Sequence, residues 1–253
     1  MSPSLPDRAF CSRLAGGTAV VVARVSPDLP EPNLTGAAEA LTALFAAIPS
    51  IDPESDLVWH ADPLGKPILI WAGELARWAG ERGLDDRHLH VSNTHDREFH
   101  FVAVAYGDGI AGVGVDVVAL ERLQRRERGH LLRLARRIMG DEEWNSFESA
   151  VAGLTQDELV VRTAAHFSLM EAASKALGTG LALGLGLGRP GSVPARSIGI
   201  RRLAPEIELL FDGPAAQRMA DLGAAHARCR SEILPDHALA TVLLLRADGV
   251  SAG

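Results

Sequence analysis

Apolar residues recur along the chain at helical and at strand-like spacing, which predicts a mixture of helices and strands. The β-branched run at 19–25 is typical of a buried strand. Residues 157–178 give the clearest helix, because Leu159, Phe167 and Met170 share one face at a period of 3.6. Further strands are predicted at 99–106, 112–118, 198–202, 207–211 and 238–246, with a turn into a short strand at 62–70. Further helices are predicted at 36–48, 74–83, 121–139 and 141–150, with a helix or turn at 212–227.

The order of these elements divides the chain into two halves of similar length, 1–108 and 111–253, around the turn Gly107-Asp108-Gly109. A polar stretch that leads into a small-residue strand occurs in both halves, at 91–106 and at 229–245. We therefore expect an α+β fold, a pseudo-dimer of two similar α/β lobes, with the active site in the seam between them.

Composition excludes several classes of protein. The chain has 253 residues, of which 47% are hydrophobic, so a disordered chain is excluded. A net charge of −7 argues against a general nucleic-acid binder. No apolar run approaches the length of a membrane span, and the first ten residues lack a secretory signal, so a cytoplasmic protein is expected. Cys11 and Cys229 are too few for a metal cage and are interpreted as reduced thiols.

The strand at 112–118 carries an acid in an apolar setting. Because alternate residues of a strand share a face, Gly112, Gly114, Asp116 and Val118 point the same way. A carboxylate there is costly unless it is paired or bound to a metal. Asp116 is therefore either a salt-bridged acid near a strand end or part of a metal or catalytic site.

Only two of the 25 basic residues are lysines, Lys66 and Lys175. Lys175 follows Glu171 by four residues, so both lie on one side of the predicted helix. The pair is either an ordinary helix ion pair or a carboxylate for a cation or proton beside an ammonium for phosphate charge. In the first half, Thr94 and His95 lie in a predicted turn. The histidine is either structural or exposed, or it holds a phosphate together with Thr94, Asn93 and Lys66.

These fragments together resemble the 4′-phosphopantetheinyl transferases over most of the chain. The signature of that family is a strand of the form G-[I/V]-D-[I/V], followed by [F/W]-[S/A]-x-K-E-[A/S]-x-x-K. It stands here as Gly114-Val115-Asp116-Val117 and Phe167-Ser168-Leu169-Met170-Glu171-Ala172-Ala173-Ser174-Lys175. The two-lobed, surfactin-type members add a Gly-Lys-Pro turn and a Ser-His segment, here Gly65-Lys66-Pro67 and Thr94-His95. The tail of the main motif, 174–180, is closer to the single-domain holo-acyl-carrier-protein synthases.

Two positions depart from the family pattern. Val118 stands where two-lobed members usually have a second acid, and Met170 stands where a lysine is usual. Water can complete a magnesium shell without the second acid, since Mg²⁺ keeps several waters. Met170 lies in the apolar stripe of its helix, so we expect it to pack rather than to react.

The resemblance implies transfer of the phosphopantetheine arm of coenzyme A to a serine of an apo carrier protein, with release of adenosine 3′,5′-bisphosphate. It implies Mg²⁺ held by Asp116 and Glu171, with Glu171 as general base and Lys175 stabilising phosphoryl charge. Lys66, Thr94 and His95 match residues that bind coenzyme A around its 3′-phosphate. Two lobes in one chain favour a monomer.

A basic segment suggests where an acidic carrier protein would dock. Seven arginines lie between Glu121 and Arg137, against two glutamates, in a chain that is negative overall. Arg122–Arg137 is thus either a docking surface for the carrier or a solvated helix face.

Three other functions are alternatives to the transferase. The first is a carrier-binding homologue with lost or reduced activity, and the second is another Mg²⁺-dependent phosphotransferase. The third, an oxidoreductase, is disfavoured because the glycine run at 184–188 follows a helix instead of linking a strand to a helix.

Overall fold

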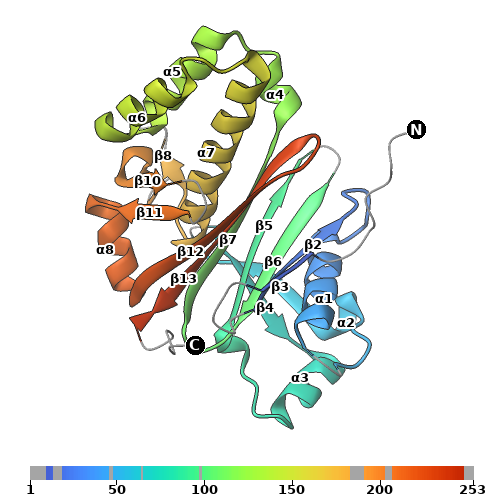
Figure 1. Ribbon diagram of the computed structural model, residues 1–253. Helices are drawn as coiled ribbons and strands as arrows, with labels where there is room; N and C mark the ends of the chain where they lie inside the picture. The colour runs from blue at the N-terminus through green and yellow to red at the C-terminus, as the bar shows by residue number, and fades with distance from the viewer. Residues whose placement is uncertain are drawn as a thin grey trace. The chain divides into compact units, whose positions relative to one another are not determined.

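The computed structural model describes residues 10–13, 19–45, 48–63, 65–96, 99–182, 191–202 and 207–247. The chain divides into two units (Figure 1). Unit 1 comprises Met1–Asp108 with Ser251–Gly253, and unit 2 comprises Gly109–Val250. The glycine run at 184–188 lies outside the described residues. Among the described residues, no helix has both the length and the apolar character needed to cross a bilayer.

Unit 1 is a four-stranded antiparallel sheet with a helix packed against it (Figure 1). The sheet has the order β1-β2-β6-β5 and consists of β1 (Phe10–Arg13), β2 (Ala19–Val25), β5 (Leu89–His95) and β6 (His100–Tyr106). Helix α1 (Pro32–Leu44) packs on β2 and β6, with Ala37 and Leu41 fully buried. The remaining elements are α2 (Pro53–Asp56), the hairpin of β3 (Leu57–Ala61) and β4 (Pro67–Trp71), α3 (Gly73–Gly80) and the 3-10 turn η1 (Asp86–His88).

Unit 2 is built on a three-stranded antiparallel sheet with the order β12-β13-β7. The strands are β7 (Ile110–Ala119), β12 (Ala224–Ile233) and β13 (His237–Arg246), and α7 (Gln156–Ala176) lies across β7 and β13 (Figure 1). The smaller elements are α4 (Leu120–Gln124), α5 (Arg128–Ile138), α6 (Asp141–Val151), β8 (Leu181–Ala182), β9 (Val193–Pro194), η2 (Ala195–Ser197), β10 (Ile198–Arg202), β11 (Glu208–Phe211) and α8 (Gly213–Asp221). Cys229 on β12 is a free thiol, and burial raises its pKa to about 12, so it stays protonated.

Both units contain a core of elements in the order strand-helix-strand-strand, with further elements inserted between its members. In unit 1 this is β2, α1, β5 and β6, and in unit 2 it is β7, α7, β12 and β13. In each unit the last strand lies between the other two. The similar segments at 91–106 and 229–245 belong to the two corresponding hairpins. The predicted α+β class is confirmed, and the two units share a topology.

Most predicted elements are present, although the helix predicted at 36–48 is α1, Pro32–Leu44. Three others differ for identifiable reasons. The helix predicted at 121–139 is two helices, because 124–130 contain no apolar residue that would bury a continuous helix. The helix or turn predicted at 212–227 ends at Asp221, since Gly223 adopts a left-handed φ of 67° that ends helices, and β12 follows. The turn predicted around Thr94 and His95 is the end of strand β5, whose register partners on β6 run from His100 to Tyr106.

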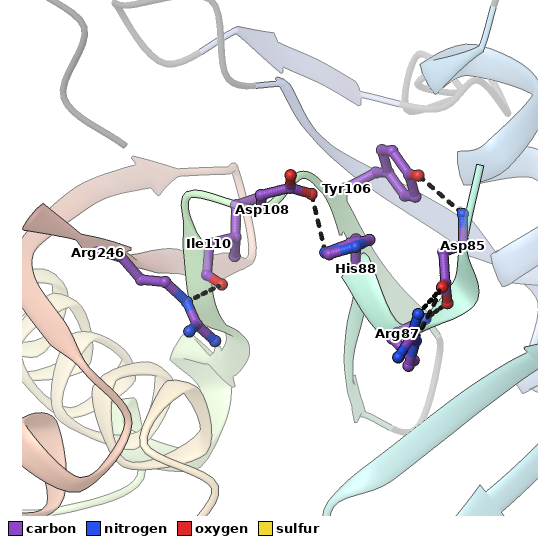
Figure 2. A network of polar contacts seen from close by, with 7 residues as sticks. All are labelled: Asp85, Arg87, His88, Tyr106, Asp108, Ile110 and Arg246. Carbon is purple, nitrogen blue, oxygen red and sulfur yellow. Dashed lines mark hydrogen bonds and ion pairs between the residues drawn. The ribbon is translucent and has the colours of Figure 1, made fainter. Parts of the chain in front are cut away.

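Polar contacts within each unit lie near the point where the chain passes from unit 1 to unit 2 (Figure 2). On the unit 1 side, His88 Nδ1 lies 2.9 Å from Asp108 Oδ1, and Tyr106 Oη accepts a hydrogen bond from the Asp85 amide at 3.1 Å. On the unit 2 side, Arg246 Nε donates to the carbonyl of Ile110 at 3.2 Å.

Two glycines of β7 allow α7 to approach the strand backbone to backbone. A Cβ atom at Gly114 would lie 1.9 Å from the Ala172 carbonyl oxygen and 2.6 Å from the Ala176 amide nitrogen. A Cβ atom at Gly112 would lie 2.1 Å from the Ala176 carbonyl oxygen. Both obstructing groups are backbone, so they cannot rotate away. Glycine is therefore required at these positions by contact rather than by backbone conformation.

We predict that Gly114→Ala lowers the free energy of unfolding by about 3 kcal/mol or more, because α7 must move away from β7. Gly153→Ala is the matched control, since a Cβ atom there has nothing within 4 Å. Urea unfolding followed by circular dichroism measures both variants. Equal stability of the two variants would contradict the close contact.

Candidate functional site

Asp116, Glu171 and Lys175 come together where β7 faces α7. Asp116 shares the face of Gly112 and Gly114 that packs on the helix, as the alternation of the strand predicted. Asp116 is only 8% exposed. Lys175 Nζ donates to Asp116 Oδ1 at 2.8 Å and to the Val115 carbonyl at 3.1 Å. The acid is thus salt-bridged, and its partner is the lysine of the predicted site.

Helix α7 begins at a well-defined residue, which fixes the register of the face that carries Glu171 and Lys175. The Glu158 amide donates to Thr155 Oγ1 at 3.3 Å, and the Thr155 amide donates to Glu158 Oε2 at 2.8 Å. This reciprocal capping box satisfies two amides at the start of the helix. Glu171 and Lys175 then lie one turn apart near its end, on the side that meets Asp116.

The electrostatic environment of Glu171 favours its protonated form. Burial is the largest cause, and repulsion by Asp116 adds to it, while Lys175 acts in the opposite direction. Together they raise the pKa of Glu171 to about 7. A carboxyl group with that pKa can both accept and release a proton near neutral pH.

The same two carboxylates are the candidate ligands for a divalent cation. Within the described residues, no group of three or more His, Cys, Asp or Glu side chains could hold a metal ion. Any ion at Asp116 and Glu171 would take its other ligands from water or substrate oxygens. That donor set fits Mg²⁺, which prefers oxygen ligands and keeps several waters. The carboxylates of Asp116 and Glu171 repel each other, and a cation bound between them would relieve that repulsion.

The two departures from the family pattern are both core residues of unit 2. Val118 is 7% exposed and Met170 is fully buried, and both belong to the cluster beneath α7. Met170 therefore packs, as its place in the apolar stripe predicted. Neither residue brings a charge to the site.

The candidate coenzyme A residues lie in unit 1. Lys66 ends the tight loop between β3 and β4, where its amide donates to Asp62 Oδ1 at 2.8 Å and Gly65 has a φ of 86°. Thr94 is buried on β5, and the adjacent His95 is exposed. The assignment of these three residues to coenzyme A stays a prediction.

Two residues that sequence reasoning missed contact the end of β5. Asn33 on α1 accepts hydrogen bonds from Asn93 and His100, and the ring of His100 lies against that of His95. The only sequence signal is the pair of histidines five residues apart around a predicted turn. That signal does not reveal the contact with α1.

The seven arginines of 122–137 differ in their surroundings. Arg128 donates to the carbonyls of Val151 and Leu154 at 2.7 and 3.0 Å, which satisfies the end of α6. Arg125 pairs with Glu121, and Arg136 pairs with Asp141. The segment is therefore partly structural, while the side chains of Arg126 and Arg133 are exposed.

Comparison with known proteins gives the family. The sequence pattern of the 4′-phosphopantetheinyl transferase superfamily matches residues 112–238. A holo-[acyl-carrier-protein] synthase of Halorhodospira halophila is 36% identical over 136 residues, which are 54% of this chain and 98% of that protein. A holo-[acyl-carrier-protein] synthase of Edwardsiella ictaluri is 34% identical over 116 residues, 46% of this chain and 82% of that protein.

A solved structure, the holo-[acyl-carrier-protein] synthase of Neisseria meningitidis, is similar with a TM-score of 0.41 and 28% identity, over 54% of this chain and 99% of that one. From the family match and the two relatives, the chain belongs to the 4′-phosphopantetheinyl transferase superfamily. The matched range contains Asp116, Glu171 and Lys175 and does not extend to Lys66, Thr94 or His95.

We predict a pH dependence of stability from Glu171. The folded chain keeps the Glu171 proton up to a higher pH than the unfolded chain does. Its contribution to the free energy of unfolding is therefore present at low pH and is lost as the pH rises from 4.5 to about 7. With a metal chelator present, the loss should be about 3 kcal/mol. Urea unfolding below and above that interval measures it.

Glu171→Gln should remove this loss, so that the variant is more stable than the wild type at the higher pH. Glu148→Gln, at an exposed position on α6, is the control and should leave the profile of the wild type. Parallel profiles for the wild type and Glu171→Gln would show that Glu171 has an ordinary pKa.

Proposed function

We propose that this protein moves the phosphopantetheine arm of coenzyme A to a serine of an apo acyl or peptidyl carrier protein and releases adenosine 3′,5′-bisphosphate. The observation that carries the proposal is the meeting of Asp116, Glu171 and Lys175 inside the part of the chain that matches the superfamily. Relatives that match this chain are holo-[acyl-carrier-protein] synthases.

The reaction exchanges one phosphorus–oxygen bond for another. The serine oxygen forms a bond to the phosphorus that carries the pantetheine, and the bond from that phosphorus to the bridging pyrophosphate oxygen breaks. The leaving group is adenosine 3′,5′-bisphosphate. The serine hydroxyl loses its proton, so the site needs a group that accepts it near neutral pH.

Glu171 is the group in this site that meets that need. Its carboxyl group lies beside Asp116 and Lys175, and in the ionised form it can accept the serine proton directly or through a bound water. We assign it as the general base.

Lys175 supplies the positive charge of the site. Its ammonium group is held by Asp116 and the Val115 carbonyl, which fixes it beside β7. A fixed ammonium stabilises negative charge that develops on a phosphoryl group without having to reorganise. Asp116 thus has a positioning role toward Lys175 as well as the proposed role of metal ligand.

Mg²⁺ is the proposed cofactor, with Asp116 and Glu171 as its protein ligands. When bound, it would neutralise the charge of the pyrophosphate of coenzyme A. Lys66, Thr94 and His95 are the proposed ligands of coenzyme A around its 3′-phosphate. The exposure of His95 and the loop position of Lys66 support this assignment.

We predict that Glu171→Gln lowers the rate of transfer by about 100-fold or more, because the glutamine amide cannot accept the serine proton. The assay mixes the protein with coenzyme A, Mg²⁺ and an apo carrier protein, and mass spectrometry follows the gain of one phosphopantetheine arm. Glu148→Gln, at an exposed position, should keep the wild-type rate. A chelator should stop the reaction, and added Mg²⁺ should restore it.

A wild-type protein that binds the carrier and modifies none of it would support the alternative of an inactive homologue. Product formation without any carrier would indicate another Mg²⁺-dependent phosphotransferase. A Glu171→Gln variant with full activity would remove Glu171 from the mechanism.

Arg122–Arg137 is the proposed docking surface for an acidic carrier. The support is charge: the segment is basic within a chain of net charge −7, and Arg126 and Arg133 are exposed on it. A basic surface raises the rate at which an acidic partner meets the protein.

We predict that Arg126→Glu with Arg133→Glu raises the KM for the carrier by roughly 10-fold and leaves the KM for coenzyme A unchanged. Arg77→Glu with Arg82→Glu, at exposed positions of α3 and just after it, is the control with the same change in net charge. Steady-state kinetics with each substrate varied in turn give both constants. An equal effect of the two double variants would contradict a local docking surface.

A further inference from the structure

A chain of contacts in unit 1 runs from the start of α1 to the end of β5. His95 and His100 are register partners on β5 and β6, so their side chains lie on the same face of the sheet. Their rings are stacked, with centroids 5.9 Å apart and planes 20° apart. His100 Nε2 in turn lies 2.6 Å from Asn33 Oδ1, which also accepts a hydrogen bond from Asn93 Nδ2 at 3.0 Å.

This geometry fixes the protonation state of the His100 ring, which is the inner of the two rings. An amide oxygen only accepts hydrogen bonds, so Nε2 of His100 carries a proton and donates it to Asn33. His100 is 6% exposed, and burial together with repulsion from His95 lowers its pKa. At neutral pH the inner ring is therefore neutral and held in one orientation.

The ring of His95, the outer of the two, is exposed where that of His100 is buried. His95 reaches solvent, while the His100 ring is stacked beside it. A neutral, hydrogen-bonded ring behind His95 restricts the orientation of the outer imidazole and places no charge against it. An imidazole held in this way presents the nitrogen atoms of its ring in a fixed direction.

We propose that Asn33 and His100 are positioning residues that hold the His95 ring in the orientation that binds a phosphomonoester, the 3′-phosphate of coenzyme A. This inference rests on the proposed function, which assigns His95 to that phosphate. Neither Asn33 nor His100 needs to touch the ligand. Each acts through the ring of His95.

The test compares coenzyme A with 3′-dephospho-coenzyme A, which differs only in the group that His95 would bind. Isothermal titration calorimetry on the full chain gives the Kd of both ligands for the wild type and three variants. His95→Ala removes the ring, Asn33→Ala removes the anchor, and His100→Phe keeps a flat ring that cannot donate to Asn33. We expect the Kd of coenzyme A to rise about 5-fold in the Asn33 and His100 variants, the effect of one misaligned charge-assisted hydrogen bond. The Kd of 3′-dephospho-coenzyme A should be unchanged.

The outcomes separate this inference from the function on which it rests. If His95→Ala loses the preference for coenzyme A while Asn33→Ala and His100→Phe keep it, the positioning role is wrong and the assignment of His95 stands. If the last two variants weaken both ligands equally, their role is only structural, and the inference is overturned. If His95→Ala keeps the preference, both this inference and the assignment of His95 fail, while the transfer assay still tests the catalytic function independently.

Discussion

The contact between β7 and α7 is the constraint on which the site depends. With no side chain at Gly112 and Gly114, helix carbonyls occupy the space that a Cβ atom would fill. The helix is therefore held so close that the next residue on that strand face, Asp116, meets the side chain of Lys175 directly. The same closeness buries Glu171 and brings it within the influence of Asp116, which raises its pKa.

One face of β7 thus changes character along its length. Gly112 and Gly114 contact the helix backbone, Asp116 contacts a helix side chain, and Val118 joins the apolar core. Met170 on α7 is buried in that same core. A charge at either Val118 or Met170 would have to be buried among apolar residues, which is costly without a partner. The charged groups are therefore confined to one position along the strand.

Local patterns predicted the parts of this arrangement but not how they meet. The alternation of β7 gave the face of Asp116, and the spacing of four gave the common side of Glu171 and Lys175. The ion pair of Asp116 and Lys175 joins residues 59 apart, so it depends on tertiary packing that no local pattern contains. Strand β5 was predicted to be a turn around Thr94 and His95 because its end is polar. Its pairing with the apolar strand β6 overrides that local preference.

The two units show how one topology supports different chemistry. In unit 1 the close approach is reversed, since the glycine is on the helix: a Cβ atom at Gly36 would lie 2.7 Å from the Val102 side chain of β6. Strand β2 of that unit faces α1 with Val21 and Ala23, so apolar side chains fill the interface. In unit 2 the glycines are on strand β7, and Asp116, two residues after Gly114, contacts Lys175 of the helix. The missing side chains thus lie on the strand in unit 2 and on the helix in unit 1. The polar groups of unit 1 lie instead at the strand end of β5, where solvent can reach His95.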